Sequence, residues 1–334
     1  MIDKRGALRL AGVGALSVLI PARAQAASRL RFAASSPFSL SYAAVFYAKS
    51  AGYFQREGLD VDIRAAKGAS AAEQLVIASH ADIADAGGAQ YIAARIDANA
   101  PLIAIATMAQ TSPFFMVLAP GSSASPSNLK GKTIGLDSLG GAMETALNLM
   151  LQETNVDAGS VKRVKAADIP ASYGLILAKN IDGLMASVGP VTKIRASDPN
   201  AVAYSVNDGV AGQVFVASPT AIKGDEERYV GFLRAVHRSA AAILDAPDPK
   251  AILKAIAFVA DVPDLKDTDS AVLDLKQIAQ TWIAEGRKNL LRNVAEQWAA
   301  AVQAMSASHM IKTAADPTIL YTNALLDKAA HADQ

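Results

Sequence analysis

The pattern of hydrophobic and polar positions along the chain switches repeatedly between one typical of strands and one typical of helices. Between residues 30 and 217, short apolar or alternating runs predict strands, and apolar positions that recur every three or four residues predict helices. The predicted strands are Leu30–Ala34, Leu59–Arg64, Asp82–Asp85, Pro101–Met108, Phe114–Leu118, Thr133–Leu136, Val161–Ala166, Ile181–Met185, Ala201–Val206 and Gly212–Ala217. The predicted helices are Tyr42–Phe54, 67–78, Gln90–Ile96, Met143–Gln152, Ala171–Lys179 and Val191–Ala196. Strands that alternate with helices favour an α/β fold with mainly parallel sheets flanked by helices.

Beyond Ser218 the pattern becomes helical. The prolines that punctuate this region, at positions typical of helix starts and breaks, are Pro219, Pro249, Pro263 and Pro317. Large aromatic side chains on the predicted helices are expected to pack in the core, as aromatic residues at helical spacing usually do. They are Phe232, Trp282, Trp298 and Tyr321.

One strand-to-helix connection has the features of an anion site. The strand Thr133–Leu136 is followed by Ser138 and by two glycines, Gly140 and Gly141, before a helix that begins near Met143. Small residues leave the first N–H groups of a helix accessible, and these donors at the positive end of the helix dipole favour an anion. The alternative is an ordinary connection whose glycines only allow a positive φ. The sequence leaves both open.

Length and composition narrow the functional class. The 334 residues suffice for two lobes with separate cores. The formal net charge is +1; without the first 26 residues, which hold four basic residues and one acidic residue, 28 basic residues stand against 30 acidic ones. A near-neutral chain without basic runs gives no support for nucleic-acid binding. The chain has no cysteine, which excludes disulfides, thiolate metal sites and lipid anchors on cysteine.

The N-terminus has the three parts of an export signal. Lys4 and Arg5 form a charged start, residues 10–20 an apolar run, and Ala-Gln-Ala at 24–26 a small-x-small cleavage pattern. We therefore predict a signal peptide over residues 1–26 and a mature protein in the periplasm. The charged start resembles a twin-arginine signal with Lys in the first position, so the twin-arginine and general secretory routes both stay open.

Signatures of enzymes and cofactor sites are missing from the sequence. Gly131-Lys132-Thr133 imitates the end of a phosphate-binding loop, but Pro126 stands where that loop needs a glycine. No G-x-S-x-G motif is present, and the four histidines have no metal-ligand spacing. We therefore predict no catalytic residue, no metal and no cofactor.

Two motifs resemble a family of periplasmic binding proteins for nitrate, sulfonates, taurine and thiamine-pyrimidine precursors. Residues 52–61 contain Gly-Tyr-Phe and then Glu-Gly-Leu-Asp-Val, which is similar to the family's GYF…EGLDV signature. Residues 128–135, Asn-Leu-Lys-Gly-Lys-Thr-Ile-Gly, are similar to its LKGKxIG strand. The segments 181–183 and 232–235 resemble two further family elements, and the resemblance covers about residues 30–330.

The resemblance implies the type II periplasmic binding fold, in which two α/β lobes joined by crossing strands close on a ligand in the cleft between them. We expect lobe 1 to comprise residues 27–111 and 212–334, with a helical C-terminal segment, and lobe 2 to comprise residues 112–211. Binding sites in such sheets lie at strand carboxyl ends and between domains. The expected ligand-binding residues are Ser36, Pro37, Phe38, Tyr42, Gly87, Gly88, Ser112, Phe114, Ser138, Gly140, Gly141, Ser187 and Val188.

The implied function is that of a monomeric solute receptor, which delivers a small-molecule ligand to the permease of an ABC transporter in the inner membrane. The candidate loops offer hydroxyls and backbone amides but no Arg or Lys. This favours a small organic anion, a sulfonate or a carboxylate, held by hydroxyls and helix N-termini. Nearby aromatic side chains keep aromatic acids open.

Two alternatives arise from the same resemblance. One is a binding protein for a thiamine-pyrimidine precursor. The other, less favoured, is an enzyme similar to a thiamine-pyrimidine synthase, whose His and iron-linked Cys cluster this cysteine-free chain cannot supply. Many relatives carry an aromatic residue and an acid before the proline that matches Pro190, where this chain has Val188 and Gly189. That departure weakens the hypothesis that an acid in this loop holds a positive amino group.

Overall fold

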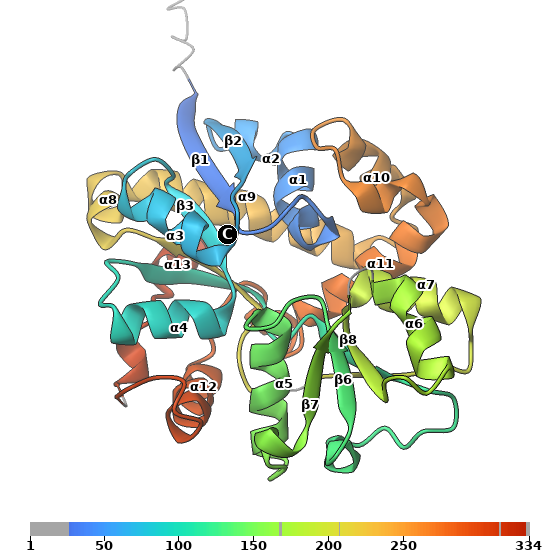
Figure 1. Ribbon diagram of the computed structural model, residues 1–334. Coiled ribbons are helices and arrows are strands. Elements are labelled where there is room, and N and C mark those ends of the chain that lie inside the picture. The colour runs from blue at the N-terminus through green and yellow to red at the C-terminus, as the bar shows by residue number, and fades with distance from the viewer. Residues whose placement is uncertain (1–26, 167–168, 207, 314, 332–334) are drawn as a thin grey trace, which may run out of the picture.

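Two five-stranded sheets, with helices against their faces, organise the chain (Figure 1). The computed structural model describes residues 27–166, 169–206, 208–313 and 315–331. The chain completes four strands of the first sheet, passes to the second sheet for five strands, and returns to the first sheet for one more. The predicted signal peptide, residues 1–26, lies outside the described residues.

All ten predicted strands are present, each within two residues of its expected ends. The first sheet has the order β2-β1-β3-β10-β4 and the second the order β7-β6-β8-β5-β9. The strands of the first sheet are β1 (Ser28–Ala34), β2 (Leu59–Ala65), β3 (Ile83–Ala86), β4 (Ile103–Ala109) and β10 (Gln213–Ala217). Those of the second are β5 (Phe114–Leu118), β6 (Thr133–Leu136), β7 (Lys162–Lys165), β8 (Gly183–Ser187) and β9 (Val202–Ser205).

Both sheets are mixed, half parallel and half antiparallel. In the first sheet β1 is parallel to β2 and β3, while β10 is antiparallel to β3 and β4. In the second sheet β6 is parallel to β7 and β8, while β5 is antiparallel to β8 and β9. The antiparallel strands β5 and β10 are the ones that follow each passage between the sheets. The expected parallel pairing therefore holds where a helix connects the strands, since a helical crossover brings the chain back in the same direction.

The helices between the strands follow the predicted pattern with one correction. They are α1 (Ala43–Ser50), α2 (Tyr53–Arg56), α3 (Ala69–Ile77), α4 (Gly88–Asp97), α5 (Ala142–Glu153), α6 (Ile169–Leu177) and α7 (Val188–Ser197). The single helix predicted over Tyr42–Phe54 is divided into α1 and α2. Gly52 separates them with a φ of 74°, a left-handed conformation that ends a helix and that glycine adopts without strain.

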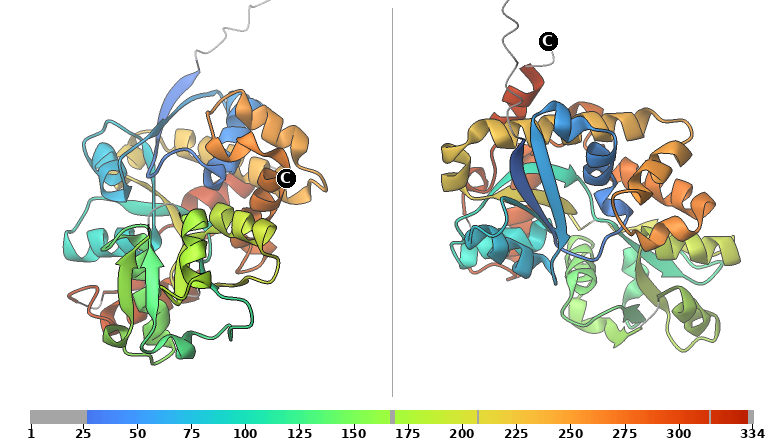
Figure 2. Two further views of the ribbon diagram at one scale, coloured as in Figure 1. Left: turned by 45° about the vertical axis from the view of Figure 1, so that its right-hand side comes forward. Right: turned by 90° about the horizontal axis from the view of Figure 1, so that it is seen from above.

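The helical C-terminal segment is confirmed. It comprises α8 (Pro219–Gly224), α9 (Glu226–Asp245), α10 (Lys250–Ala257), α11 (Thr268–Thr281), α12 (Ala295–Ala307) and α13 (Ala324–His331). Side-chain caps mark two of the starts: Ser218 accepts a hydrogen bond from the N–H of Ala221, and Asp267 accepts from that of Ser270. In Figure 2 these helices wrap around the first sheet and reach toward the second.

Aromatic packing joins the C-terminal helices to the first sheet. Phe232 on α9 is stacked between Phe54 and Phe32, with ring centroids 5.4 Å and 5.8 Å away. Trp282 and Trp298 are buried as well, so the expected core role is confirmed for three of the four aromatics. Tyr321 is half-buried, lies in a bridge to Ala104 rather than on a helix, and stacks on Trp298. Offset aromatic stacking adds to the burial of apolar surface, and this packing fixes α9 against the sheet.

No helix among the described residues combines the length and the apolar character that a membrane span needs. The strands of the first sheet come from residues 28–109 and 213–217, and those of the second from residues 114–205. The residue bounds given above for the two lobes stay a prediction.

Candidate functional site

A cavity of about 700 Å³ lies between the two sheets. The first sheet contributes the loop after β1, the end of β3 and the start of β10. The second contributes the start of β5, the end of β8 and the start of α5, and α11 adds a further wall. Because β5 and β10 are antiparallel to their neighbours, their first residues reach the carboxyl ends of the parallel strands. Phe114 thereby pairs with Ser187, and Gln213 pairs with Ala109.

Asp85 organises the first-sheet side of the cavity. It lies at the end of β3 with 3% of its surface exposed. Oδ1 accepts a hydrogen bond from the N–H of Ser35 at 2.9 Å, and Oδ2 accepts from Ser35 Oγ at 2.9 Å and from Gln213 Nε2 at 3.3 Å. Burial raises the pKa of Asp85, while the hydrogen bonds from Ser35 act in the opposite direction. The carboxylate therefore holds the loop after β1 against the start of β10.

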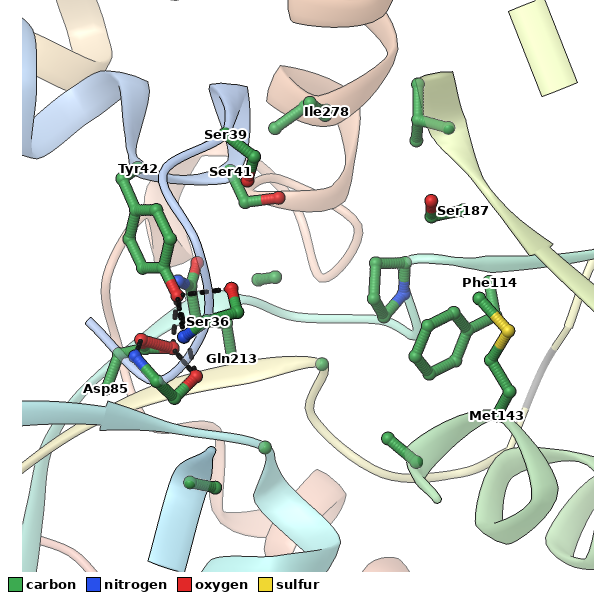
Figure 3. Close-up of a pocket in the computed structure, with 18 of the residues that line it drawn as sticks. Ser36, Ser39, Ser41, Tyr42, Asp85, Phe114, Met143, Ser187, Gln213 and Ile278 are labelled. Carbon is green, nitrogen blue, oxygen red and sulfur yellow. Dashed lines mark hydrogen bonds between the residues drawn. The ribbon is translucent and has the colours of Figure 1, made fainter. Parts of the chain in front are cut away.

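Tyr42 extends this network along the same loop. Its hydroxyl accepts a hydrogen bond from the N–H of Ser36 at 3.1 Å and lies 2.9 Å from Ser36 Oγ. Burial and the nearby charge of Asp85 raise the pKa of Tyr42, so the phenol stays protonated. In Figure 3, two labelled groups face each other across the cavity: Ser36, Tyr42, Asp85 and Gln213 on one side, and Phe114, Met143 and Ser187 on the other.

One face of α11 closes the cavity on a third side. Asp274, Ile278 and Thr281 line it at the spacing of a single helical face, and Trp282 lines it from the position directly after the helix. Asp274 is 4% exposed, and its Oδ1 has no hydrogen-bond partner among the described residues. Burial raises the pKa of Asp274, and the Thr192 hydroxyl lowers it.

Acidic side chains outnumber basic ones around the cavity. The lining carboxylates are Asp85, Asp137, Asp264 and Asp274, whereas Lys67 is the lining cation among the described residues. These charged residues are not among the ligand-binding residues predicted from the sequence. A signal existed for Asp85, which ends a predicted strand at its carboxyl end, as ligand-facing residues in α/β sheets do. Asp264 lies in the 3-10 helix Pro263–Lys266 and Asp274 in α11, both in the C-terminal segment, where no strand end marks a site.

The start of α5 is partly occupied by the protein's own carboxylate. The N–H of Gly140, a residue with a φ of 74°, donates to Glu144 Oε2 at 2.6 Å. Glu144 also lies 3.5 Å from Arg163 Nε. The contact is similar to the reciprocal half of a capping box, in which an acid in the first turn reaches back to the N–H of the N-cap residue, but here the donor is the residue before the N-cap, Gly141. The later N–H groups of the first turn have no partner within the helix, as at any helix start.

Eight of the thirteen expected ligand-binding residues line the cavity: Ser36, Tyr42, Gly87, Phe114, Gly140, Gly141, Ser187 and Val188. The other five, Pro37, Phe38, Gly88, Ser112 and Ser138, are not among the lining residues. That the eight contact a ligand stays a prediction.

Three of the five that lie elsewhere, Phe38, Gly88 and Ser138, have local partners of their own. Phe38 turns toward the core and meets Phe46 edge to face, with centroids 5.1 Å apart. The N–H of Gly88 donates to the carbonyl of Ala211 at 3.1 Å. Ser138 Oγ donates to Asp137 Oδ1 at 3.1 Å, and Ser112 is buried. Local packing determines whether a residue of a loop lines the cavity. A loop predicted from the sequence does not reveal that packing.

No group of three or more His, Asp or Glu side chains within the described part of the chain is arranged to hold a metal ion. The polar groups of the cavity are hydroxyls, amides and carboxylates joined in hydrogen bonds. Such an arrangement can orient and hold a small polar molecule.

Comparison with known proteins identifies the fold and the family. The family model described as NMT1/THI5 like matches residues 39–250. No curated protein is similar enough in sequence to match. The periplasmic sulfonate-binding protein SsuA from Methylobacillus flagellatus is 16% identical with a TM-score of 0.68, over 92% of this chain and 95% of that one.

Two further solved structures have the same architecture. The periplasmic nitrate-binding protein NrtA from Synechocystis PCC 6803 is 12% identical with a TM-score of 0.61, over 91% of this chain and 88% of that one. The desulfurization enzyme DszB is 10% identical with a TM-score of 0.60, over 92% of this chain and 100% of that one. These likenesses confirm the two-lobe type II periplasmic binding fold.

Proposed function

The chain belongs to the NMT1/THI5-like family, and we propose that it is the periplasmic solute receptor of an ABC importer. The observation that carries the proposal is the cavity of about 700 Å³ between the two sheets, to which strand ends from both contribute. A ligand held there touches both lobes, so its binding free energy favours their closure. The closed, loaded receptor then delivers its solute to a permease in the inner membrane.

Export to the periplasm belongs to this proposal. The charged start, apolar run and Ala-Gln-Ala pattern of residues 1–26 support it, and so do the periplasmic proteins SsuA and NrtA of the same fold. We expect the mature chain to begin near Ala27 and to act as a monomer. N-terminal sequencing of the protein from a periplasmic extract tests the site of cleavage. An intact Met1 on protein from the cytosol would contradict it.

The proposed solute is a small organic acid, a sulfonate or a carboxylate, with aromatic acids included. Hydroxyls of Ser36, Tyr42 and Ser187 and the first N–H groups of α5 support an acidic group, and Phe114 supports an aromatic one. The alternative solute is a thiamine-pyrimidine precursor. One observation favours it: lining carboxylates outnumber lining cations, which suits a ligand with N–H donors better than a simple anion.

We expect binding without turnover. An enzyme similar to a thiamine-pyrimidine synthase would need a cysteine cluster, and the chain has no cysteine. The same fold does carry an enzyme in DszB, so catalysis is the alternative that a test must address.

Thermal-shift measurements on the mature chain test the proposal. The panel comprises sulfonates, nitrate, taurine, aromatic carboxylates and pyrimidines. A ligand at about 100 times its dissociation constant should add about 2.7 kcal/mol to the free energy of unfolding. Mass spectrometry of the recovered ligand is the control. A chemically altered ligand would contradict the receptor and favour an enzyme.

A further inference from the structure

Asp85 is a buried acid that has no cationic partner in the described part of the chain. It is 3% exposed, and among the described residues none of the ion pairs includes it. A buried carboxylate is costly unless hydrogen bonds or an opposite charge compensate for the lost water. Here three hydrogen bonds reach it, from Ser35 N–H, Ser35 Oγ and Gln213 Nε2. They reach both of its oxygens but supply no counter-charge.

These hydrogen bonds fix the direction of the protons in the cavity wall. In its ionised form Asp85 only accepts, and the Ser35 hydroxyl then donates its single proton to Asp85. The Ser35 oxygen is then left with lone pairs. Gln213 donates one of its two amide hydrogens to Asp85, which leaves the other as a donor and Oε1 as an acceptor. The carboxylate therefore makes the Ser35 hydroxyl an acceptor, next to the Gln213 Oε1, at the edge of the cavity.

The other carboxylates that line the cavity also favour a solute that carries hydrogen-bond donors. Asp264 and Asp274 line it from the C-terminal segment, and Asp137 lines it from the second sheet. Asp264 accepts a hydrogen bond from the N–H of Leu40 at 3.0 Å, while Asp274 Oδ1 has no partner among the described residues. A solute with donor groups would meet complementary partners on this wall, and a solute with acceptors alone would face repulsion.

We propose that Asp85 is a positioning residue that makes this wall of the cavity select solutes carrying N–H donors. The inference rests on the proposed function, because it assigns a chemical feature to the solute of that same cavity. An amino group on the organic acid would donate to the Ser35 and Gln213 oxygens, and a protonated amine would also supply the counter-charge that Asp85 lacks.

Paired probes that differ by one amino group test the inference on the mature chain. The pairs are β-alanine and propionate, taurine and ethanesulfonate, and 3-aminobenzoate and benzoate. Titration calorimetry gives the ratio of dissociation constants within each pair. Hydrogen bonds to charged groups predict that the amino member binds at least about tenfold tighter in the pair that fits the cavity best. Equal affinities within every pair, or tighter binding of the members without an amino group, overturn the inference while the receptor proposal stands.

The variant Asp85→Asn tests the residue itself. Asparagine keeps the shape, removes the charge and supplies a donor, so the Ser35 hydroxyl is freed and the ratio within a pair should fall toward one. A purely structural role would weaken both members equally and leave the ratio unchanged, which would overturn the assignment.

Asp182→Asn is the matched control. Asp182 also accepts a backbone N–H, that of Thr133 at 2.9 Å, but it does not line the cavity. This variant should keep the wild-type ratio. The ratio of dissociation constants for the wild-type protein is measured without any variant. It therefore tests the selection for N–H donors even if Asp85→Asn does not fold.

Discussion

Gly212 lies directly against the carbonyl oxygen of Thr111, at the place where the two chain segments that join the sheets run side by side. The N–H of Gly212 donates to the carbonyl of Ala109 at 2.9 Å. A Cβ on Gly212 would overlap the Thr111 oxygen and would lie 3.0 Å from Pro113 Cδ. The two crossings are therefore in backbone contact, and only glycine allows it.

Replacing Gly212 by alanine should destabilise the protein. The added methyl group meets main-chain atoms that cannot rotate away, and overpacking of this kind costs about 1–3 kcal/mol. Urea unfolding of Gly212→Ala measures the loss. Gly224→Ala is the control, because a Cβ at Gly224 meets nothing within 4 Å. Equal stability of the two variants would show that the crossings tolerate separation.

Lobe closure should bend the chain after Gln110 rather than before it. The N–H of Gln110 donates to the carbonyl of Thr281 at 2.8 Å, and its Oε1 accepts from the N–H of Glu285 at 2.8 Å. These bonds tie the first crossing to the C-terminal segment, so the dihedral changes of a hinge fall in 111–113. Small-angle scattering with and without a saturating ligand should show a smaller radius of gyration in the complex. An unchanged radius would contradict closure.

Removing the carboxylate of Glu144 should strengthen the binding of an organic acid. Glu144 occupies the N–H of Gly140 and places a negative charge at the start of α5. A charge at a helix start is worth about 0.3–1 kcal/mol, which corresponds to a gain in affinity of about two- to fivefold for Glu144→Gln. Calorimetry with the tightest-binding acid of the thermal-shift panel measures it.

A substitution that adds a negative charge at the start of α5 tests the same prediction in the opposite direction. Gly141→Asp adds a carboxylate beside the same N–H groups and should weaken the same acid. Melting temperatures of both variants separate a change of affinity from a loss of folding. If both variants fold and bind as the wild type does, the start of α5 is not part of the site.

Asp208 should make stability fall as the pH rises. Burial raises its pKa from 3.8 to about 6, so the folded protein binds a proton that the unfolded chain releases. The stabilisation is complete below pH 3.8 and is lost as the pH rises through about 6, by about 2–3 kcal/mol. Asp208→Asn should therefore be more stable than the wild type at pH 7.5 but not at pH 3.8.

Urea midpoints at several pH values measure this difference. The exposed substitution Asp60→Asn is the control and should follow the wild-type curve. A wild-type stability that does not fall between pH 4 and pH 7 would contradict the prediction.

Local patterns were enough to predict the strands and most helices, because period and turn residues are local properties. The division at Gly52 depends on a single left-handed residue, which a continuous apolar pattern over 42–54 conceals. The direction of β5 and β10 depends on how the chain passes between the sheets, which no local pattern encodes.

The site was harder to predict than the fold. Glycines and hydroxyls at strand ends identified the loops around Ser36, Gly140 and Ser187. The partners that determine their chemistry come from distant positions: Gln213 reaches Asp85 across 128 residues of sequence. Phe38 belongs to a correctly predicted loop, but packing against Phe46 removes it from the lining.

The wall formed by α11 has a consequence for shortened forms of the protein. Every strand of both sheets is complete by Ala217, yet the residues that line the third side of the cavity follow only at Asp274–Trp282. A chain cut between these two points would keep the sequence of both sheets and lose one wall of the cavity. Possession of both sheets is therefore not enough for binding, and a truncation that spares them should still remove it.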